Sequence, residues 1–459
     1  MVGRTDEAIA KLQVLLGDRL STNASIRDHH GKDLTWHEPH VPDAVAFPLS
    51  TQEVSGIMRI CSETVTPVVP FGAGTSLEGH VIPSRGGVCL DLMRMDQVIR
   101  VDTEDMDAVV QPGVTRKRLN EFLRDTGLFF PIDPGADASI GGMVATRASG
   151  TNAVRYGTMR ENVMALTVVL ASGDIVRTGG RARKSAAGYD LTRLFVGSEG
   201  TLGVITEVTL RLHGMPEAVS SAVCAFESIE GAVNTVIGTI QSCIPVARIE
   251  LMDDVQIDAV NRYSKLSYPL KPTLLLEFHG TATAVKEQAE AVQAIAEEHG
   301  GSGFKWTSQE AERRKLWQAR HDAYFAALSL RPGVQGWATD VCVPISRLAD
   351  CIRETKVDLA NTYLKAPLVG HVGDGNFHLT FLVDRNNSEE ITEAKRLNDR
   401  LVHRALSMGG TCSGEHGVGS GKIKYLPVEH GEPGVQLMRL LKRSIDPQNI
   451  MNPGKILAL

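Results

Sequence analysis

Three separate stretches dense in glycine stand in the first half of the chain, and they are the strongest constraint on its fold. They cover residues 71–79, 140–150 and 197–203. Small residues make poor core material, but they allow a backbone to lie close against a flat ligand. A single glycine loop often binds nothing, whereas three in one domain indicate that this part of the chain is built around a bound group.

The first of these stretches looks at first like part of a dinucleotide-binding fingerprint, because two of its glycines are followed by Asp91. Pro83 and the glycine pair at 86–87 leave no room for the crossover helix that this fingerprint requires. We therefore expect the loop to bind phosphate through backbone N–H groups that form a nest, with the hydroxyls of Thr75 and Ser76 beside them.

A segment of the second half, Gly-His-Val-Gly-Asp-Gly-Asn-Phe-His at 370–378, places two histidines around a strong turn signal. The apolar runs on both sides predict a β-hairpin. With a loop at 373–376, His371 directly faces His378, and both imidazoles share one face with Cβ atoms about 5 Å apart. This arrangement suits two ligands of one metal ion, although two ordinary sheet histidines fit it equally well. A second stretch, Gly-Glu-His-Gly at 414–417, offers a carboxylate and a third imidazole.

The composition excludes several classes of protein. A net charge of −6 without a long basic tract argues against nucleic-acid binding. Seven cysteines without a C-x-x-C pair argue against an iron–sulfur cluster or a structural zinc in this chain, and they fit a reducing compartment. Residues 1–20 carry charges throughout, which predicts an amphipathic helix and not a signal or transit peptide. With no run of about eighteen apolar residues, we expect a cytoplasmic protein, with peripheral docking to a membrane left open.

The pattern of elements changes near Pro216. Short strands and helices alternate before it, and longer helices follow it at 232–241, 282–298, 308–328 and 389–408. Strand patterns at 248–252, 273–278 and 336–341 lie between them, and a last helix is expected at 434–445. This alternation predicts a second domain of the α+β class with an antiparallel sheet. We therefore divide the chain into a helical lead-in (1–37), a first domain (38–215), a second domain (216–412) and a C-terminal helical segment (413–459).

The order of four motifs in the first domain is informative. They are Pro70-Phe-Gly-Ala-Gly-Thr-Ser, Asp133-Pro-Gly-Ala, Gly141-Gly-Met and Gly197-Ser-Glu-Gly-Thr-Leu-Gly. With them, residues 38–213 resemble the FAD-binding domain of the vanillyl-alcohol oxidase/PCMH superfamily, which has two α/β subdomains. The resemblance implies bound FAD. No histidine or cysteine stands out as a covalent anchor for it, His80 being the nearest candidate, so we expect FAD to be bound non-covalently. The resemblance places the pyrophosphate in the first loop, the 134–157 stretch along the pyrophosphate and isoalloxazine, and the 197–205 stretch on the adenine side. The residues expected to contact FAD are Pro70, Gly72, Ala73, Gly74, Thr75, Ser76, Pro134, Gly135, Ser139, Gly141, Gly142, Gly150, Tyr156, Gly157, Glu199, Gly203, Ile205 and Asn452.

The second half carries further motifs, namely the histidine segment 370–378, Gly-Glu-His-Gly-Val-Gly at 414–419 with Lys422, and Asp446-Pro447 with the Asn-Pro pair at 452–453. It resembles the C-terminal domain of FAD-linked oxidases found in D-lactate and D-2-hydroxyglutarate dehydrogenases and in the glycolate oxidase flavoprotein subunit. The resemblance implies a substrate-binding cap and oxidation of a 2-hydroxy acid to a 2-oxo acid, with the hydride passed to flavin N5. The local sequences at 316–321 and 339–344 most resemble those of the cytochrome-type D-lactate dehydrogenase branch.

The residue types fit that chemistry. An alcohol is too weak an acid for a neutral histidine to deprotonate unless a divalent metal polarises the oxygen. Two imidazoles and one carboxylate leave open positions on a metal, so we assign His371, His378 and Glu415 as ligands of zinc or manganese. His416 is the expected general base and Arg320 the expected partner of the substrate carboxylate. The alternative without a catalytic role is a packed histidine for His416 and an exposed helix-surface arginine for Arg320.

The substrate and the electron acceptor are less constrained. Hydroxyglutarate-type relatives tend to carry a lysine where Ala338 stands here, which favours D-lactate or a longer apolar 2-hydroxy acid. Three functions stay open: a D-2-hydroxy-acid dehydrogenase that passes electrons to a cytochrome, quinone or electron-transfer flavoprotein, a flavoprotein subunit that needs an iron–sulfur partner, and a metal-dependent hydrolase without flavin. A homodimer is compatible with all three.

Overall fold

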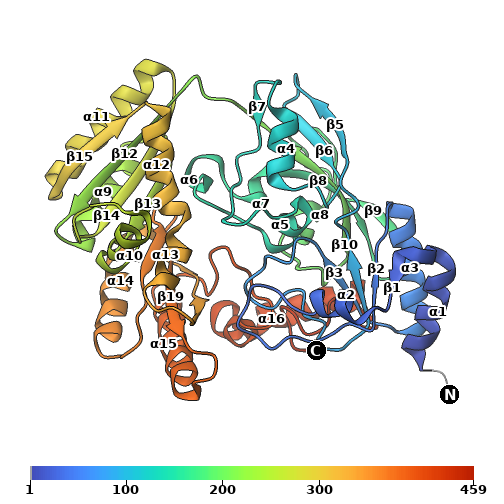
Figure 1. Ribbon diagram of the computed structural model, residues 1–459. Helices are drawn as coiled ribbons and strands as arrows, with labels where there is room; N and C mark the ends of the chain where they lie inside the picture. Colours follow the sequence, from blue (N-terminus) through green and yellow to red (C-terminus); the bar gives the residue numbers. More distant parts are fainter. Residues whose placement is uncertain (1–2) are drawn as a thin grey trace. The chain divides into compact units, whose positions relative to one another are not determined.

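The computed structural model describes residues 3–459, and the chain divides into two units. The first unit takes the chain through Ser149 and includes Gly157–Met215 and Glu415–Leu459, and the second comprises Gly150–Tyr156 and Pro216–Gly414. Both combine helices with largely antiparallel sheets, so the expected α+β class is confirmed (Figure 1). Among the described residues, no helix has the length and apolar character needed to cross a membrane.

The first unit is built on two main sheets (Figure 1). The four-stranded sheet has the order β1-β2-β4-β3 and is parallel from β2 to β3. The five-stranded sheet, β5-β6-β10-β8-β9, is antiparallel throughout, and β7 and β11 form a small separate pair. The strands are β1 (Leu20–Ser21), β2 (Ala44–Ala46), β3 (Val68–Phe71), β4 (Val88–Asp91), β5 (Val98–Asp102), β6 (Asp107–Val110), β7 (Leu128–Phe129), β8 (Val163–Val169), β9 (Ile175–Arg177), β10 (Val204–Arg211) and β11 (His213–Gly214).

The helices of the first unit follow the local signals of the sequence. One example is α3 (Thr51–Thr64), which begins where the Ser50 hydroxyl accepts the N–H of Glu53 at 3.2 Å and buries Ile57 and Met58 in the core. The expected helix at 434–445 forms the second half of α16, which is kinked at Gly431. The helices are α1 (Arg4–Leu16), α2 (Ala24–His29), α3, α4 (Arg116–Leu123), α5 (Ile140–Thr146), α7 (Met159–Asn162), α8 (Leu191–Phe195) and α16 (Leu426–Ile445), with 3-10 turns η1 (Gly17–Arg19) and η2 (Ile423–Tyr425). Met1 and Val2, where the N-terminal helix was expected to start, lie outside the described residues.

The second unit is organised by one antiparallel sheet of eight strands in the order β15-β12-β14-β13-β18-β19-β16, with β17 also paired to β19. Strand β14 lies between β12 and β13, and its residues are buried along nearly its whole length. The strands are β12 (Ala218–Phe226), β13 (Val246–Met252), β14 (Thr273–Gly280), β15 (Gly301–Thr307), β16 (Gln335–Ala338), β17 (Val341–Cys342), β18 (Leu368–His371) and β19 (Asn376–Val383).

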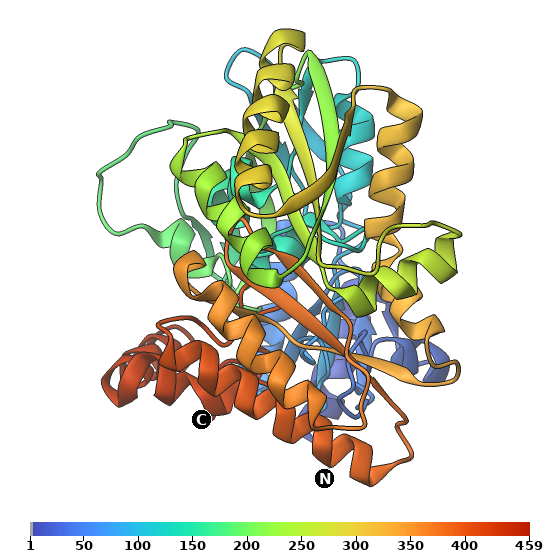
Figure 2. The ribbon, with the colours of Figure 1, turned by 90° about the vertical axis from the view of Figure 1, so that its left-hand side faces the viewer.

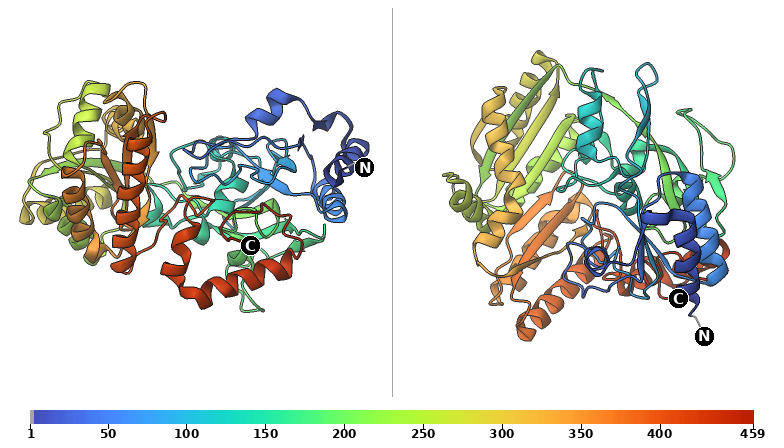
Figure 3. Two further views of the ribbon diagram at one scale, coloured as in Figure 1. Left: turned by 90° about the horizontal axis from the view of Figure 1, so that it is seen from below. Right: turned by 45° about the vertical axis from the view of Figure 1, so that its right-hand side comes forward.

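The helices of this unit pack on the sheet and on one another (Figure 2). The predicted helix at 308–328 is two helices, because the chain turns at Asp322 between α12 and α13. Helices α14 and α15 lie side by side, and Arg400 pairs with Asp358 at 2.7 Å (Figure 3). The helices are α6 (Ala153–Tyr156), α9 (Ile229–Gln241), α10 (Asp254–Ser264), α11 (Ala282–Glu298), α12 (Glu310–His321), α13 (Ala323–Ser329), α14 (Ile345–Ala360) and α15 (Ser388–Ser407).

Candidate active site

The histidine hairpin forms, but its register differs from the expected one. His371 lies opposite Asn376, and His378 lies opposite Val369, so the loop covers 372–375 and not 373–376. Asn376 belongs to the strand because its amide donates to Val341 O and to the carboxylate of Asp340, both at 2.7 Å. The two histidines are therefore diagonal neighbours on one face, with ring centroids 5.4 Å apart.

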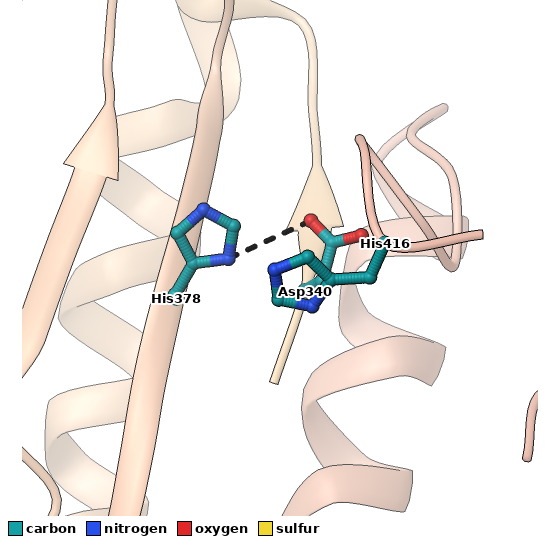
Figure 4. Close-up of side chains that lie close together, drawn as sticks. All are labelled: Asp340, His378 and His416. Carbon is teal, nitrogen blue, oxygen red and sulfur yellow. Dashed lines mark ion pairs between the residues drawn. The ribbon is translucent and has the colours of Figure 1, made fainter. Parts of the chain in front are cut away.

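Each imidazole is oriented through its Nδ1 atom. His371 Nδ1 lies 2.7 Å from a carboxylate oxygen of Glu250, and His378 Nδ1 lies 3.0 Å from the carbonyl oxygen of Thr339. These oxygens can only accept, so in the neutral form of both rings Nδ1 carries the proton and Nε2 carries the lone pair that can bind a metal. Asp340 lies 3.6 Å from the same Nδ1 of His378 (Figure 4).

Glu415 and His416 follow directly on a backbone position that is packed against the hairpin. A Cβ atom on Gly414 would lie 2.2 Å from the Asn376 amide nitrogen, so the chain passes against that side chain at this point. Glu415 and His416 are the next two residues of the chain, so their backbone starts beside the hairpin. Two groups of side chains each have ligand atoms that lie within 4.8 Å of one another. One is His371 with His378 and Glu415, and the other, drawn in Figure 4, is Asp340 with His378 and His416.

This donor set fits a catalytic divalent metal. Two imidazole nitrogens and one carboxylate are typical of zinc sites that keep a position open for substrate, and manganese accepts the same ligands. The hydrogen bonds on Nδ1 that orient metal-bound histidines are present on both rings. The second group includes Asp340, whose two carboxylate oxygens accept hydrogen bonds from the Asn376 amide and the Ser413 hydroxyl, both at 2.7 Å.

Arg320 lies close to the hairpin, but its guanidinium is engaged. Nε donates to Glu250 at 2.8 Å, and a second guanidinium nitrogen lies 2.8 Å from the same carboxylate oxygen. Burial alone would raise the pKa of Glu250, yet His371 and Arg320 together hold this pKa below its usual value. Glu250 therefore joins the expected carboxylate-binding residue to the expected metal ligand, and the exposed-surface alternative for Arg320 does not apply, since its side chain is 13% exposed.

The loops predicted to hold FAD are tightly apposed within the first unit. A Cβ on Gly72 would lie 2.3 Å from the Ser139 hydroxyl, and one on Gly141 would lie 2.5 Å from Pro112, so the first two glycine-dense stretches lie against their neighbours at van der Waals distance. Gly74 has a φ of +66°, which favours glycine. The buried hydroxyl of Ser198 has no hydrogen-bond partner among the described residues, which fits a ligand polar group at this loop.

Other residues assigned to FAD have protein partners. The hydroxyl of Ser76 donates to Asp33 at 2.9 Å, and the Asn452 amide donates to the carbonyl oxygens of His80 and Glu199 at 2.9 and 2.7 Å. His80 is buried beside the Glu199 carboxylate at 3.3 Å. These contacts give Asn452 a structural role that the sequence did not predict.

The segment Gly150–Tyr156 joins the second unit, while Gly157 belongs to the first. The hydroxyl of Tyr156 lies 2.8 Å from His279 Nδ1, and His279 Nε2 lies 2.9 Å from Glu277. The remaining positions assigned to FAD are Ala73 and Thr75 in the loop after β3, Pro134 and Gly135 before α5, Gly142 within α5, Gly203 before β10, and Ile205 buried in β10.

Glu250 is the main residue that the sequence analysis missed. It stands in Val-Ala-Arg-Ile-Glu-Leu-Met of β13 and is fully buried. A carboxylate between apolar neighbours, here Ile249 and Leu251, is costly to bury unless it has charged partners, and this was the available signal.

Comparison with known proteins assigns the family. Residues 42–179 match the model of the FAD binding domain, and residues 215–456 match that of the FAD linked oxidases, C-terminal domain. The chain belongs to the FAD-linked oxidase family. This FAD-linked oxidase is 52% identical, over 99% of its length and 92% of the relative's, to a Danio rerio protein named "Probable D-lactate dehydrogenase, mitochondrial". It is 49% identical to the Arabidopsis thaliana "D-lactate dehydrogenase [cytochrome], mitochondrial", over 98% of this chain and 80% of that one. The fold is also that of p-cresol methylhydroxylase with substrate bound, at 19% identity and a TM-score of 0.79, over 99% of this chain and 96% of that one.

Proposed function

We propose that this FAD-linked oxidase oxidises a D-2-hydroxy acid, D-lactate or a related apolar one, to the 2-oxo acid, and that it passes the electrons to an acceptor such as a cytochrome. The support is the likeness to relatives named D-lactate dehydrogenase over nearly the whole chain. The observation that carries the proposal is the pair His371 and His378, whose Nδ1 atoms are both held so that the Nε2 atoms can bind a metal.

The roles of the side chains follow from their chemistry. His371, His378 and Glu415 would hold zinc or manganese, which when bound polarises the substrate hydroxyl, and bound FAD would supply the hydride acceptor. His416 would take the hydroxyl proton, since an imidazole nitrogen can act as a general base. Arg320 would neutralise the substrate carboxylate through guanidinium hydrogens that do not bind Glu250.

Anaerobic bleaching of the flavin tests this function. The purified protein is mixed with D-lactate, L-lactate, D-2-hydroxyglutarate and glycolate, before and after treatment with a chelator. We expect D-lactate to bleach the flavin fastest and chelation to slow bleaching strongly. If L-lactate bleaches the flavin and D-lactate does not, the proposed handedness is wrong, and bleaching that survives complete removal of metal refutes the role of the two histidines.

The acceptor and the location follow as separate points. The name of one relative includes the word cytochrome, so we propose a cytochrome as the first acceptor to test, by its reduction under the same conditions. Both relatives are named mitochondrial, which does not support the cytoplasmic location that the composition favoured.

A further inference from the structure

We infer that Glu199 is a positioning residue for the loop that carries Glu415 and His416. This inference rests on the proposed function, because it assigns Glu199 to the site that activates the substrate. Within the first unit, one oxygen of the Glu199 carboxylate accepts the N–H of Val418 at 2.7 Å, and the other accepts the N–H of Gly419 at 2.8 Å. The carboxylate therefore binds two successive amides, which belong to the second and third residues after His416.

The direction of this carboxylate is fixed by its own backbone. Glu199 has a φ of +52°, a left-handed conformation that non-glycine residues seldom adopt. Its N–H donates to Ala145 O at 2.9 Å, and its carbonyl oxygen accepts from the Asn452 amide at 2.7 Å. A sparsely populated conformation persists when its surroundings hold it, and functional positions often use it. Bound from both sides, Glu199 has little freedom to turn its side chain elsewhere.

The loop after His416 lies in close contact with this carboxylate and leaves no space for a further side chain. A Cβ on Gly417 would lie 2.6 Å from His80 Nε2 and 2.7 Å from a Glu199 carboxylate oxygen, and one on Gly419 would lie 2.0 Å from Glu78 O. His80 itself lies 3.3 Å from the Glu199 carboxylate. Because Glu199 is only 6% exposed and is surrounded by these groups, its carboxylate serves the loop and not the cofactor.

The consequence concerns the placement of the two functional residues. The chain is held on one side of Glu415 and His416 by the two amides that bind Glu199. Metal ligands tolerate only small displacements, and losing a group that orients them typically costs 10- to 100-fold in metal affinity or activity. Since Glu199 stands in the third glycine-dense loop, the motif that serves FAD would also hold the residues that act on the substrate.

Glu199→Gln is the decisive variant, because glutamine has one acceptor oxygen for two amides and turns an NH₂ donor toward the other. Glu207→Gln is the matched control, since Glu207 lies in β10, directly after the third glycine-dense loop, and its carboxylate accepts the Thr167 hydroxyl at 2.8 Å. Glu199→Asp keeps both acceptor oxygens on a shorter side chain and should recover part of the loss. Four quantities are measured on the FAD-containing protein: FAD content, Mn²⁺ affinity after chelation, the rate of flavin reduction by saturating D-lactate, and hydrogen exchange of the 415–419 backbone.

For Glu199→Gln we expect normal FAD content, faster exchange at 415–419, and losses of about 10-fold in Mn²⁺ affinity and in reduction rate, with Glu207→Gln unchanged. Loss of FAD from the variant overturns the inference, because the carboxylate would then serve the cofactor. Wild-type exchange and Mn²⁺ affinity also overturn it. The proposed function fails separately, if the wild-type protein binds no Mn²⁺ or is reduced by no 2-hydroxy acid, whereas the exchange measurement still reports on Glu199.

Discussion

Replacing Glu250 by glutamine tests whether this carboxylate sets the metal-binding form of His371. Glu250 is fully buried and binds His371 Nδ1 at 2.7 Å and Arg320 Nε at 2.8 Å. Glutamine keeps one acceptor oxygen and replaces the other by an NH₂ donor, so only one neighbour retains an acceptor. The effect depends on which neighbour loses it.

The two costs are unequal. Breaking a buried pair that contains Arg320 leaves an uncompensated charge, at a cost of about 3–5 kcal/mol. If His371 gives up its bond, Nδ1 becomes the acceptor and Nε2 takes the proton, so the metal loses a ligand lone pair. Loss of such support costs about 10- to 100-fold in metal affinity, which is about 1.4–2.7 kcal/mol. The smaller cost falls on His371, so we expect the glutamine oxygen to face Arg320 and the metal dissociation constant to rise about 10- to 100-fold.

Titration calorimetry of the metal-free protein with Zn²⁺ or Mn²⁺ measures this constant. Glu390→Gln is the matched control, because Glu390 is also buried and binds a guanidinium, that of Arg331, at 2.8 Å. We expect the control to bind metal as the wild type does. A dissociation constant for Glu250→Gln within about threefold of the wild type, roughly 0.6 kcal/mol, refutes the reasoning. Equal losses in both variants would assign the effect to general destabilisation.

Three further predictions concern other parts of the molecule. Arg320→Lys should raise KM for D-lactate about 10- to 100-fold with a smaller change in kcat, because a charged hydrogen bond is worth about 1.5–3 kcal/mol; an unchanged KM in steady-state kinetics contradicts its role. Gly375→Ala should lower the free energy of unfolding by at least about 1 kcal/mol more than Gly409→Ala. Both glycines have a φ of +79°, but only at Gly375 would a Cβ meet a backbone atom, Val343 O, at 2.0 Å. Equal losses for the two variants in denaturant titrations refute the clash. Burial lowers the pKa of His213 from 6.5 to about 4, so the unfolded chain takes up the proton first and stability falls as the pH drops through this window. The His213→Gln variant should therefore gain thermal stability relative to the wild type at pH 4.5 but not at pH 7.5. A difference in melting temperature that is the same at both pH values refutes this role of His213.

The sequence was sufficient where a local signal decides the structure. The Asp-Gly turn and the flanking apolar runs predicted the hairpin of β18 and β19, and the glycine-dense stretches predicted the cofactor-binding domain. The register was wrong by one loop position, because the side chain of Asn376 bonds to Asp340 and Val341, which are remote in sequence. Turn chemistry alone cannot report such contacts, so it placed Asn376 in the loop.

Glu250 shows why the remainder of the site was out of reach. A glutamate between two apolar residues of a strand signals that a charged partner exists, because burying an isolated carboxylate is prohibitive. It does not identify the partner, and here Arg320 and His371 are 70 and 121 residues away. Glu199 presents the converse case: its motif predicted the shape of the loop, but its carboxylate binds amides 219 and 220 residues further on. A motif fixes backbone conformation through neighbouring residues, whereas the direction of a buried charge is set by whichever distant groups compensate it, so buried carboxylates are where a family resemblance transfers least well to individual side chains.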